Sequence, residues 1–487
     1  MSSQPKTGKK SVPEEDKAYC EPLLKQLADE VAAALKEELV PSVEDLDAEL
    51  GHCINVVQYL LRDPRPVRVY IPEGSPLGVG DATEDEADII MLTEQEAEIR
   101  FASGDLGDKP IVIREPGKDT KDGFRDFLST LRRSLYTGNE TLDIQDVRGG
   151  DAKSMNAAKV LDQFEKNPNG RLKVPYGPYN GLNIDGRLFP NLLPRFLHGF
   201  SYRLLHHCND RARYKHVNAA NVEERKAAEA KGLGKRKLEV MNVAVEKRIK
   251  NGKSTASKSH IKVVRHQDAE ACETFAICAQ RGCASGYHKD ISNGTGARNI
   301  FGDKLWFMPF GLTAAELEQF RIRGTRFRAP AEKLRYIHLR PGDFLIMPPG
   351  TSSIHAPLTL TDCGMTGGMF WSYKRIVQTL QQITFAAENL DVTNELPPAQ
   401  LPDILDALEE EIAANPENFE TEDMKKDDVA RVVGVEITKL RTALSCDCVK
   451  CDNACPCSFY ERNCTRFCHT QRTGECAKAW KAITTLG

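Results

Sequence analysis

Apolar residues recur at the three- and four-residue spacing of amphipathic helices near the start of the chain and again over its last third. The segments with this pattern are 18–62, divided in two at Pro41, then 124–135, 155–165, 191–206 and 376–440. Two shorter helices are expected at 93–101 and 313–322, because a threonine precedes each and, in the first, a glutamate follows at capping-box spacing. The acid-rich stretch 73–92 is expected to be loop.

Between 262 and 373 the pattern changes to short β-prone runs divided by Gly, Asp and Pro. The runs are IKVVRH, ETFAICA, RNIF, KLWFMPF, RYIHL, DFLIMP and GGMFWSY. An earlier run at 109–113 has proline at its edge. Short strands at even spacing are typical of a barrel or a double-sheet jelly roll. The expected fold class is therefore α+β, with helices flanking a β-rich core.

Charge and length add a domain-level picture. A chain of 487 residues has room for two or three domains. Its net charge is only −4, but 211–265 carries 16 Lys or Arg against 5 Asp or Glu, and 401–433 carries 11 acidic against 3 basic residues. The basic segment is interpreted either as a solvated insertion or as a nuclear import signal or phosphate-contacting arm. The chain has no apolar run of about 18 residues, so no membrane span is expected, and its first 17 residues lack the apolar core of a secretory signal.

A candidate metal-ligating pattern lies at 286–290, Gly-Tyr-His-Lys-Asp. On a strand, His288 and Asp290 would share a face. Two histidines and one carboxylate are the ligand set of many iron oxygenases, and His355, after a later strand, is the expected third ligand. The H-x-D pattern alone is weak, because an isolated histidine is more often an ordinary core or surface residue.

A lysine strengthens this interpretation. Lys304 enters the apolar run KLWFMPF after a Gly-Asp turn, fourteen residues beyond Asp290. Inside a barrel its ammonium would need an anion, because burying an unpaired charge is costly. The distal carboxylate of 2-oxoglutarate would satisfy it; otherwise Lys304 reaches solvent at the strand end.

These motifs, GYHKD, GDKLWF, LRPGDFLIMPPGTSSIHAPLT and GGMFW, together resemble the Jumonji C domain, particularly its fungal members. The resemblance is strong over 284–371 and weak over the earlier part of 95–376. It implies a double-stranded β-helix with Fe(II) on His288, Asp290 and His355. It also implies 2-oxoglutarate on Lys304, with the Ser285 hydroxyl near the same carboxylate. The implied reaction is oxidation of a substrate C–H bond coupled to decarboxylation of 2-oxoglutarate, which removes the group when that carbon is an N-methyl.

Two departures leave the substrate open. The basic segment 211–265 stands as an insertion before the catalytic strands, and TLTDCGMTGGMFW does not reproduce the residues with which histone demethylases hold methylated lysine. Histone lysine demethylation is the preferred expectation, with hydroxylation of another protein or of methylated DNA bases as the alternative. The third possibility is that the protein is not an enzyme of this kind but a zinc-dependent DNA- or chromatin-binding protein with an inactive β-helix. Another branch of these oxygenases anchors the carboxylate with an arginine, here Arg375, and the fallback iron ligands are His338 and His266.

The end of the chain is rich in cysteine: eight of its 15 cysteines fall between 446 and 476. Thiolates at this spacing converge on zinc, which then supplies the core of so small a segment. The candidate ligands are Cys446, Cys448, Cys451, Cys455, Cys457, Cys464, Cys468, His469 and Cys476. The run CDNACPCSFYERNCTRFC resembles the CXC module of polycomb-type histone methyltransferases and tesmin-like DNA-binding proteins. Its role is either a folding staple or contact with DNA or chromatin.

The expected organisation follows from these segments. It comprises an N-terminal tail and helices, a Jumonji C-like domain with its basic insertion, a helical acidic linker and a zinc module. The bounds are 1–94, 95–376, 377–440 and 441–480. The expected cofactors are Fe(II), 2-oxoglutarate and zinc, and the expected partners are a histone tail or another chromatin protein, with DNA at the zinc module and basic segment. A nuclear location is expected.

Overall fold

The computed structural model describes part of the chain. The described residues are 11–36, 53–115, 123–134, 141–144, 153–156, 162, 182–185, 193–212, 273–393, 397–398 and 400–445. The chain divides into two compact units, of which the first comprises Met1–Leu205, Ala271–Pro397 and Asn415–Leu444, and the second His206–Glu270, Pro398–Ala414 and Ser445–Gly487. The predicted zinc ligands, the run IKVVRH and nearly all of the basic segment lie outside the described residues.

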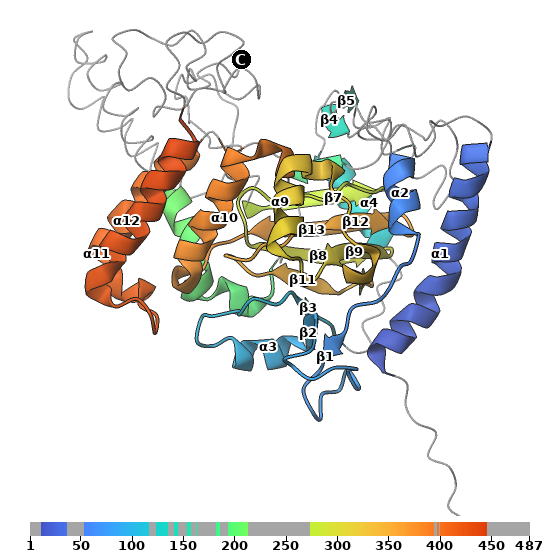
Figure 1. Ribbon diagram of the computed structural model, residues 1–487, viewed down its shortest axis with the longest axis horizontal. Helices are drawn as coiled ribbons and strands as arrows, with labels where there is room; N and C mark the ends of the chain where they lie inside the picture. The colour runs from blue at the N-terminus through green and yellow to red at the C-terminus, as the bar shows by residue number, and fades with distance from the viewer. Residues whose placement is uncertain are drawn as a thin grey trace, which may run out of the picture. The chain divides into compact units, whose positions relative to one another are not determined.

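The first unit contains a large mixed sheet (Figure 1). Its described strands are β1 Val69–Tyr70, β2 Ile89–Leu92, β3 Ile111–Ile113, β4 Thr141–Ile144, β5 Lys153–Asn156, β6 Leu182–Asp185, β7 Phe275–Ala279, β8 Thr295–Phe301, β11 Phe344–Met347 and β13 Cys363–Met369. Their order is β1-β2-β3-β11-β8-β13-β7-β6-β4-β5. The pairs β1–β2 and β2–β3 are parallel, and the remaining pairs are antiparallel.

A second, antiparallel sheet of three strands packs on the large one. It is formed by β9 (Lys304–Pro309), flanked by β10 (Leu334–Leu339) and β12 (Ala356–Thr359). Trp306 and Ile337 from this sheet lie in one apolar cluster with Leu345 and Met365 from the large sheet. The two sheets are therefore the layers of a sandwich with a shared core.

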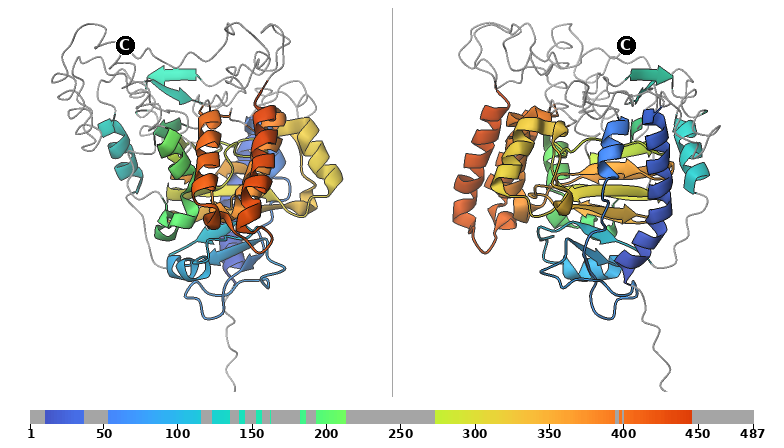
Figure 2. Two further views of the ribbon diagram at one scale, coloured as in Figure 1. Left: turned by 90° about the vertical axis from the view of Figure 1, so that its left-hand side faces the viewer. Right: turned by 45° about the vertical axis from the view of Figure 1, so that its right-hand side comes forward.

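The outer face of the small sheet is covered by two helices, α1 (Val12–Lys36) and α2 (Cys53–Leu60), as Figure 2 shows. Leu27 and Leu60 of these helices pack with Phe307 and Leu358 in a second apolar cluster. Because side chains alternate along a strand, β9 sends Leu305 and Phe307 outward and Lys304 and Trp306 inward.

The outer face of the large sheet packs on irregular segments and on α3 (Glu94–Arg100), through Ala97, Phe344 and Ile346. The other helices are α4 Gly123–Ser134, α9 Ala314–Arg323, α10 Ile376–Glu388, α11 Leu401–Ala414 and α12 Lys426–Ala443. In the first unit α10 packs along α12. None of the helices in the described ranges is long and apolar enough to cross a membrane.

The predicted α+β class is confirmed, and so are several elements. Thr93 and Thr313 cap α3 and α9, each with both hydrogen bonds of a capping box. Six of the predicted β runs contain strands, namely β7, β8, β9, β10, β11 and β13. The strand β12 was not predicted, since the run that contains it is short and carries Pro357.

Other predictions were wrong. The helix expected at 191–206 begins only at 204: within 193–203 the chain forms two 3-10 turns, η3 (Arg195–His198) and η4 (Phe200–Tyr202), because Pro194 and Gly199 on either side of the first turn have ψ of 151° and 150°. The supposed loop 73–92 ends in β2, whose four residues are all buried. A strand buried on both faces lacks the alternation that marks an exposed one. The start of the supposed helix 155–165 belongs to β5.

Candidate metal centre

Three of the predicted ligands meet in the first unit. The ligand atoms of His288, Asp290 and His355 all lie within 4.8 Å of one another, and they could hold a metal ion. Both histidines are buried, and the Asp290 side chain is 14% exposed. Residues 65 positions apart in the sequence thus form a compact N/O ligand set.

Backbone pairing brings the two histidines together. His288 N–H donates to His355 O and His355 N–H donates to His288 O, each at 3.0 Å. This is an isolated antiparallel bridge, so the expectation that His288 and Asp290 lie on a strand was wrong. The bridge still sets the two imidazole centroids 4.3 Å apart.

Each imidazole is oriented by a carbonyl two residues earlier. His288 Nδ1 lies 2.8 Å from Gly286 O, and His355 Nδ1 lies 2.9 Å from Ser353 O. Since a carbonyl oxygen only accepts, Nδ1 carries a proton in both rings, which leaves Nε2 as the atom of each ring that can bind a metal. Burial, and then the neighbouring His355, lowers the pKa of His288 to about 4, so the ring is neutral at neutral pH.

Two residues that sequence reasoning missed hold this set in place. Thr295, the first residue of β8, donates from its hydroxyl to Asp290 Oδ2, while Asp290 Oδ1 lies 3.6 Å from His355 Nε2. The Trp306 ring packs against the His355 ring, with centroids 4.8 Å apart. Trp306 could have been found from its position two residues after Lys304, on the same face of β9.

Lys289 lies between His288 and Asp290 in the sequence, and its side chain contacts α10 in place of the metal ligands. Its ammonium donates to Gln382 Oε1 on α10 and lies 4.9 Å from the centroid of the Phe385 ring. Burial lowers the pKa of Lys289 to about 7. The segment that carries His288 and Asp290 is thereby attached to α10.

Lys304 is buried on the inner face of the small sheet, with 5% of its surface exposed. Within the described part of the chain its ammonium makes no hydrogen bond or ion pair. Its charge acts on nearby groups: burial raises the pKa of the thiols of Cys283 and Cys363 to about 11 and 12, and Lys304 opposes that rise. It also contributes to the low pKa of His288, which places the ammonium within electrostatic range of the metal ligands.

Two further polar groups on this face lack partners. Thr359 lies directly opposite Lys304 in the pairing of β12 with β9, and its hydroxyl is buried without a hydrogen-bond partner among the described residues. The same holds for the indole N–H of Trp306. Ser285 lies beside β12, where its backbone N–H donates to Pro357 O at 3.1 Å. An unpaired ammonium with unpaired donors beside it fits a small anion.

The alternative residues are engaged elsewhere. The Arg375 guanidinium pairs with Asp108 and, at 3.4 Å, with Asp105, and its Nε donates to Pro349 O at 2.8 Å. His338 lies on the outer face of the small sheet, bonded to two carboxylates. His266 lies outside the described residues.

Comparison with known proteins gives a partial match. No protein-family model matches the chain. A stretch of 131 residues, 27% of the chain, is 31% identical to "KK-1 biosynthesis cluster protein D" of Curvularia clavata. That match spans 13% of the relative's length. The chain is therefore similar, over about a quarter of its length, to a small part of a longer protein.

Proposed function

We propose that this chain is an Fe(II)- and 2-oxoglutarate-dependent dioxygenase, with its two sheets forming a double-stranded β-helix of the Jumonji C type. One observation carries the proposal. Two imidazoles and a carboxylate converge within 4.8 Å, and Lys304, a buried lysine without an ion-pair partner among the described residues, lies within electrostatic range of them. A metal and a dicarboxylate together satisfy both features.

The ligand set suits the metal. Two imidazoles and one carboxylate occupy one face of a six-coordinate ion and leave the other positions open, which is the arrangement of non-haem Fe(II) oxygenases. When bound, iron with 2-oxoglutarate supplies the oxidation of a substrate C–H bond coupled to release of succinate and CO2.

The chain's own residues bind and orient. Lys304, with the Thr359 hydroxyl opposite and Ser285 nearby, would hold the distal carboxylate of 2-oxoglutarate. The charges cancel in the loaded site, because a divalent metal and Lys304 balance Asp290 and a dianion. Such balance matters between two packed sheets, where the effective dielectric constant is low.

The first test uses the whole chain with Fe(II), 2-oxoglutarate and ascorbate, and measures bound iron and succinate. His355→Ala should lose both iron and succinate formation. Lys304→Ala should keep its iron but need about 10- to 100-fold more 2-oxoglutarate, since a charge-assisted contact contributes about 1.5–3 kcal/mol. His198→Ala, at an exposed histidine of η3, is the matched control and should behave as wild type. Full activity of His355→Ala would overturn the assignment, and an iron-free, inactive wild type would favour the DNA-binding alternative.

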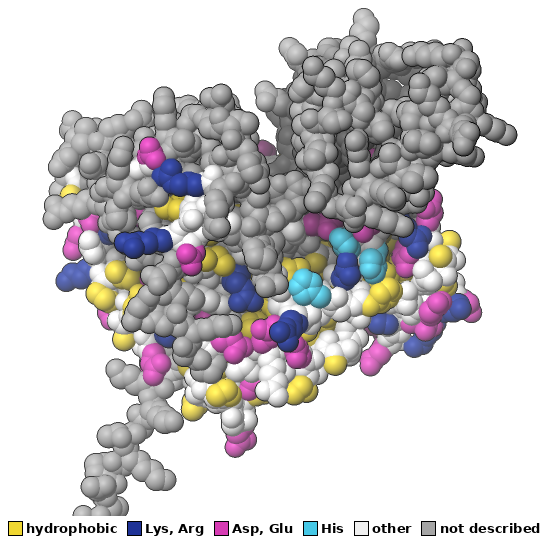
Figure 3. All heavy atoms as spheres, turned by 180° about the vertical axis from the view of Figure 1, so that it is seen from behind, with side chains coloured by type: hydrophobic (Ala, Val, Ile, Leu, Met, Phe, Trp, Pro, Cys, Tyr) yellow, Lys and Arg dark blue, Asp and Glu magenta, His cyan; other side chains and the backbone are white. Residues whose placement is uncertain are grey.

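The preferred substrate is a methylated histone lysine, and the proposed location is the nucleus. Support comes from the CXC-like cysteine run and the basic segment, which are also the proposed contacts for DNA. On the face shown in Figure 3 the acidic and basic side chains of the described residues are intermixed. Stimulation of succinate release by methylated histone peptides, and not by unmethylated ones, would support this substrate; stimulation by methylated DNA would support the alternative.

A second candidate substrate comes from the relative. The name of that relative connects it with a biosynthesis cluster, which favours oxidation of a biosynthetic small molecule by the same site. If neither histone peptides nor DNA increase succinate release, while an extract of small metabolites does and a hydroxylated product is found by mass spectrometry, this candidate replaces chromatin.

A further inference from the structure

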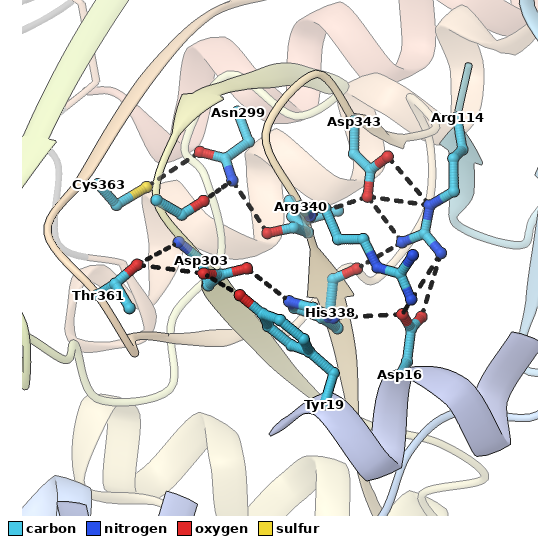
Figure 4. Close-up of polar contacts among 12 residues, drawn as sticks. Asp16, Tyr19, Arg114, Asn299, Asp303, His338, Arg340, Asp343, Thr361 and Cys363 are labelled. Atoms are coloured by element: carbon cyan, nitrogen blue, oxygen red, sulfur yellow. Dashed lines mark hydrogen bonds and ion pairs between the residues drawn. The ribbon is translucent and has the colours of Figure 1, made fainter. Parts of the chain in front are cut away.

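A buried polar cluster joins α1 to the strands that carry the co-substrate residues (Figure 4). Asp16 and Tyr19 of α1 point toward the turn before β9 and toward β10. Their partners are Asp303 and His338, which come from those two strand regions. The hydrogen bonds and ion pairs of these four side chains are made with residues other than the metal ligands.

His338 is the centre of the cluster. Its Nδ1 lies 3.3 Å from Asp16 Oδ1, and its Nε2 lies 3.0 Å from Asp303 Oδ1. Burial lowers the pKa of His338, but the hydrogen bonds to both carboxylates outweigh burial and raise the pKa well above its ordinary value. The ring is therefore an imidazolium that joins α1 to the turn. Tyr19 stacks on it at a centroid distance of 5.3 Å and donates its hydroxyl to Asp303 Oδ2 at 3.0 Å.

Arginines fix the α1 side of the cluster. Arg114 lies 3.3 Å from Asp16 Oδ2 and 2.7 Å from Asp343 Oδ2, and all three side chains are buried. Arg340 also donates to Asp16. Since β3 leads to Arg114 and β11 follows Asp343, the large sheet holds Asp16 in one position.

Hydrogen bonds at Asp303 and close packing at Gly302 hold the turn that leads into Lys304. Asp303 N–H donates to Thr361 Oγ1 at 2.7 Å, and Asp303 O accepts from Leu360 N–H at 2.9 Å. Gly302 has φ +74°, and a Cβ there would lie 2.0 Å from Asp362 O. Because side chains alternate, holding Asp303 outward against α1 directs Lys304 inward.

A second contact of α1, made by Glu30, lies beside another segment next to Lys304. Glu30 pairs with Arg281 at 2.7 Å. Arg281 N–H donates to Asp362 Oδ1, and the next residue, Gly282, donates to Thr359 O, both at 2.8 Å. Segments 281–283 and 302–304 are both hydrogen-bonded to 359–362 beside Lys304, and α1 contacts the first two through Arg281 and Asp303.

We propose that α1 is a positioning element for the co-substrate: through Asp16, Tyr19 and Glu30 it holds Asp303, His338 and Arg281 so that Lys304 faces the anion that the site binds. The inference rests on the proposed function and adds to it a residue set that acts through Lys304. Its signature is a loss of 2-oxoglutarate affinity with metal affinity unchanged, which general loss of structure would not give.

The test compares variants of a half-exposed residue. Tyr19 is 50% exposed, so its replacement is compatible with folding. Tyr19→Phe removes only the hydroxyl bonded to Asp303, and Tyr19→Ala also removes the ring over His338. The control is Lys17→Ala, an exposed position on the same helix. Dissociation constants for Mn(II), and then for 2-oxoglutarate on the Mn(II) protein without oxygen, are measured by titration calorimetry for each full-length chain.

The two Tyr19 variants should lose affinity for 2-oxoglutarate to different extents. Tyr19→Phe should weaken 2-oxoglutarate binding roughly twofold and Tyr19→Ala roughly fivefold or more, as expected for one and then several modest contacts. Mn(II) affinity should stay within twofold, and Lys17→Ala should match wild type. Hydrogen exchange of the backbone at 302–305 should be faster in Tyr19→Ala, because the turn loses its support.

Two other outcomes have distinct meanings. Wild-type affinity for 2-oxoglutarate in Tyr19→Ala, with unchanged exchange at 302–305, would overturn the positioning role and leave the proposed function intact. A wild-type protein that binds Mn(II) but no 2-oxoglutarate would overturn the proposed function, and this inference with it.

Discussion

Thr359 lies directly opposite Lys304 across the pairing of β12 with β9, and neither side chain has a hydrogen-bond or ion-pair partner among the described residues. An unpaired buried hydroxyl costs stability, and an unpaired ammonium costs more. Both costs disappear if an anion binds between them. The pair therefore links the stability of the metal-free, ligand-free protein to its affinity for a carboxylate.

The first prediction follows from that link. Thr359→Val should raise the free energy of unfolding by about 1 kcal/mol, because it removes a buried hydroxyl without a partner. It should also weaken 2-oxoglutarate binding about fivefold. Urea unfolding and calorimetric titration measure the two effects.

The matched control for that prediction is Thr384→Val. Thr384 is also buried, but its hydroxyl donates to Leu380 O at 2.8 Å. Its replacement should leave affinity unchanged and should not stabilise the protein. A Thr359→Val protein that is less stable and binds 2-oxoglutarate normally would contradict an anion site at this position.

The second prediction concerns His288 and pH. The pKa of His288 is lowered to about 4 by burial and by His355, against an ordinary value of 6.5. The unfolded chain takes up a proton at His288 as the pH falls through 6.5, whereas the folded chain does so only near 4. The metal-free protein should thus lose stability between these pH values while His288 stays neutral. Imidazole NMR of the metal-free chain measures this directly, and a His288 midpoint near 6.5 would refute it.

The third prediction concerns Asp16. Burial alone would raise the pKa of this carboxyl. The hydrogen bond from His338 and the charges of Arg114 and Arg340 together have the larger, opposite effect, so the pKa lies well below its ordinary value of 3.8. Stability from Asp16 is present above pH 3.8 and is lost as the pH falls below it. Asp16→Asn should destabilise the protein by about 3–5 kcal/mol at pH 7, because it leaves buried cations uncompensated.

The difference between wild type and Asp16→Asn should shrink in acid, which urea unfolding at pH 7 and pH 3 would reveal. Asp63→Asn is the control. Asp63 pairs with Arg65 at the surface, where both side chains are 48% exposed, and such pairs contribute little. An equal loss of unfolding free energy in both variants would show that the buried Asp16 cluster contributes no more stability than a surface ion pair.

The fourth prediction concerns the cysteine-rich end, which lies outside the described residues. The full-length chain should carry two to three zinc ions there by native mass spectrometry. Charge reversal at Lys450, Arg462 and Arg466 should lower DNA affinity and make its salt dependence shallower, by about one unit of slope per lost phosphate contact. Unchanged DNA binding with full zinc content would leave the segment as a folding staple.

The sequence was informative where chemistry is local. Thr93 was predicted to begin a helix with a capping box and Thr313 as an N-cap, because such caps depend on neighbours within four residues. His288 and Asp290 were paired by a spacing of two residues, although the strand expected for them is only a bridge. Lys304 was singled out as a charge in an apolar run, and it is buried.

The register in which the strands pair could not be predicted from the sequence. Thr359 becomes relevant only because β12 pairs with β9 so that it faces Lys304, and no local pattern encodes that alignment. Asp16 and Tyr19 look like ordinary polar residues of a surface helix, and their buried partners come from strands far along the chain. Interactions of this kind require the fold before they can be predicted.

The contact between Asp16 and His338 also has a kinetic consequence, because it joins residues 322 positions apart. At about 5–20 residues per second, a ribosome needs roughly 15–65 s to make the chain between them. Until His338 and Arg340 have been made, α1 lacks these two partners and the complete small sheet that its apolar face covers. Long-range closure of this kind slows folding, so the nascent chain carries an uncovered amphipathic helix, and its yield in a cell should depend on chaperones that bind such helices.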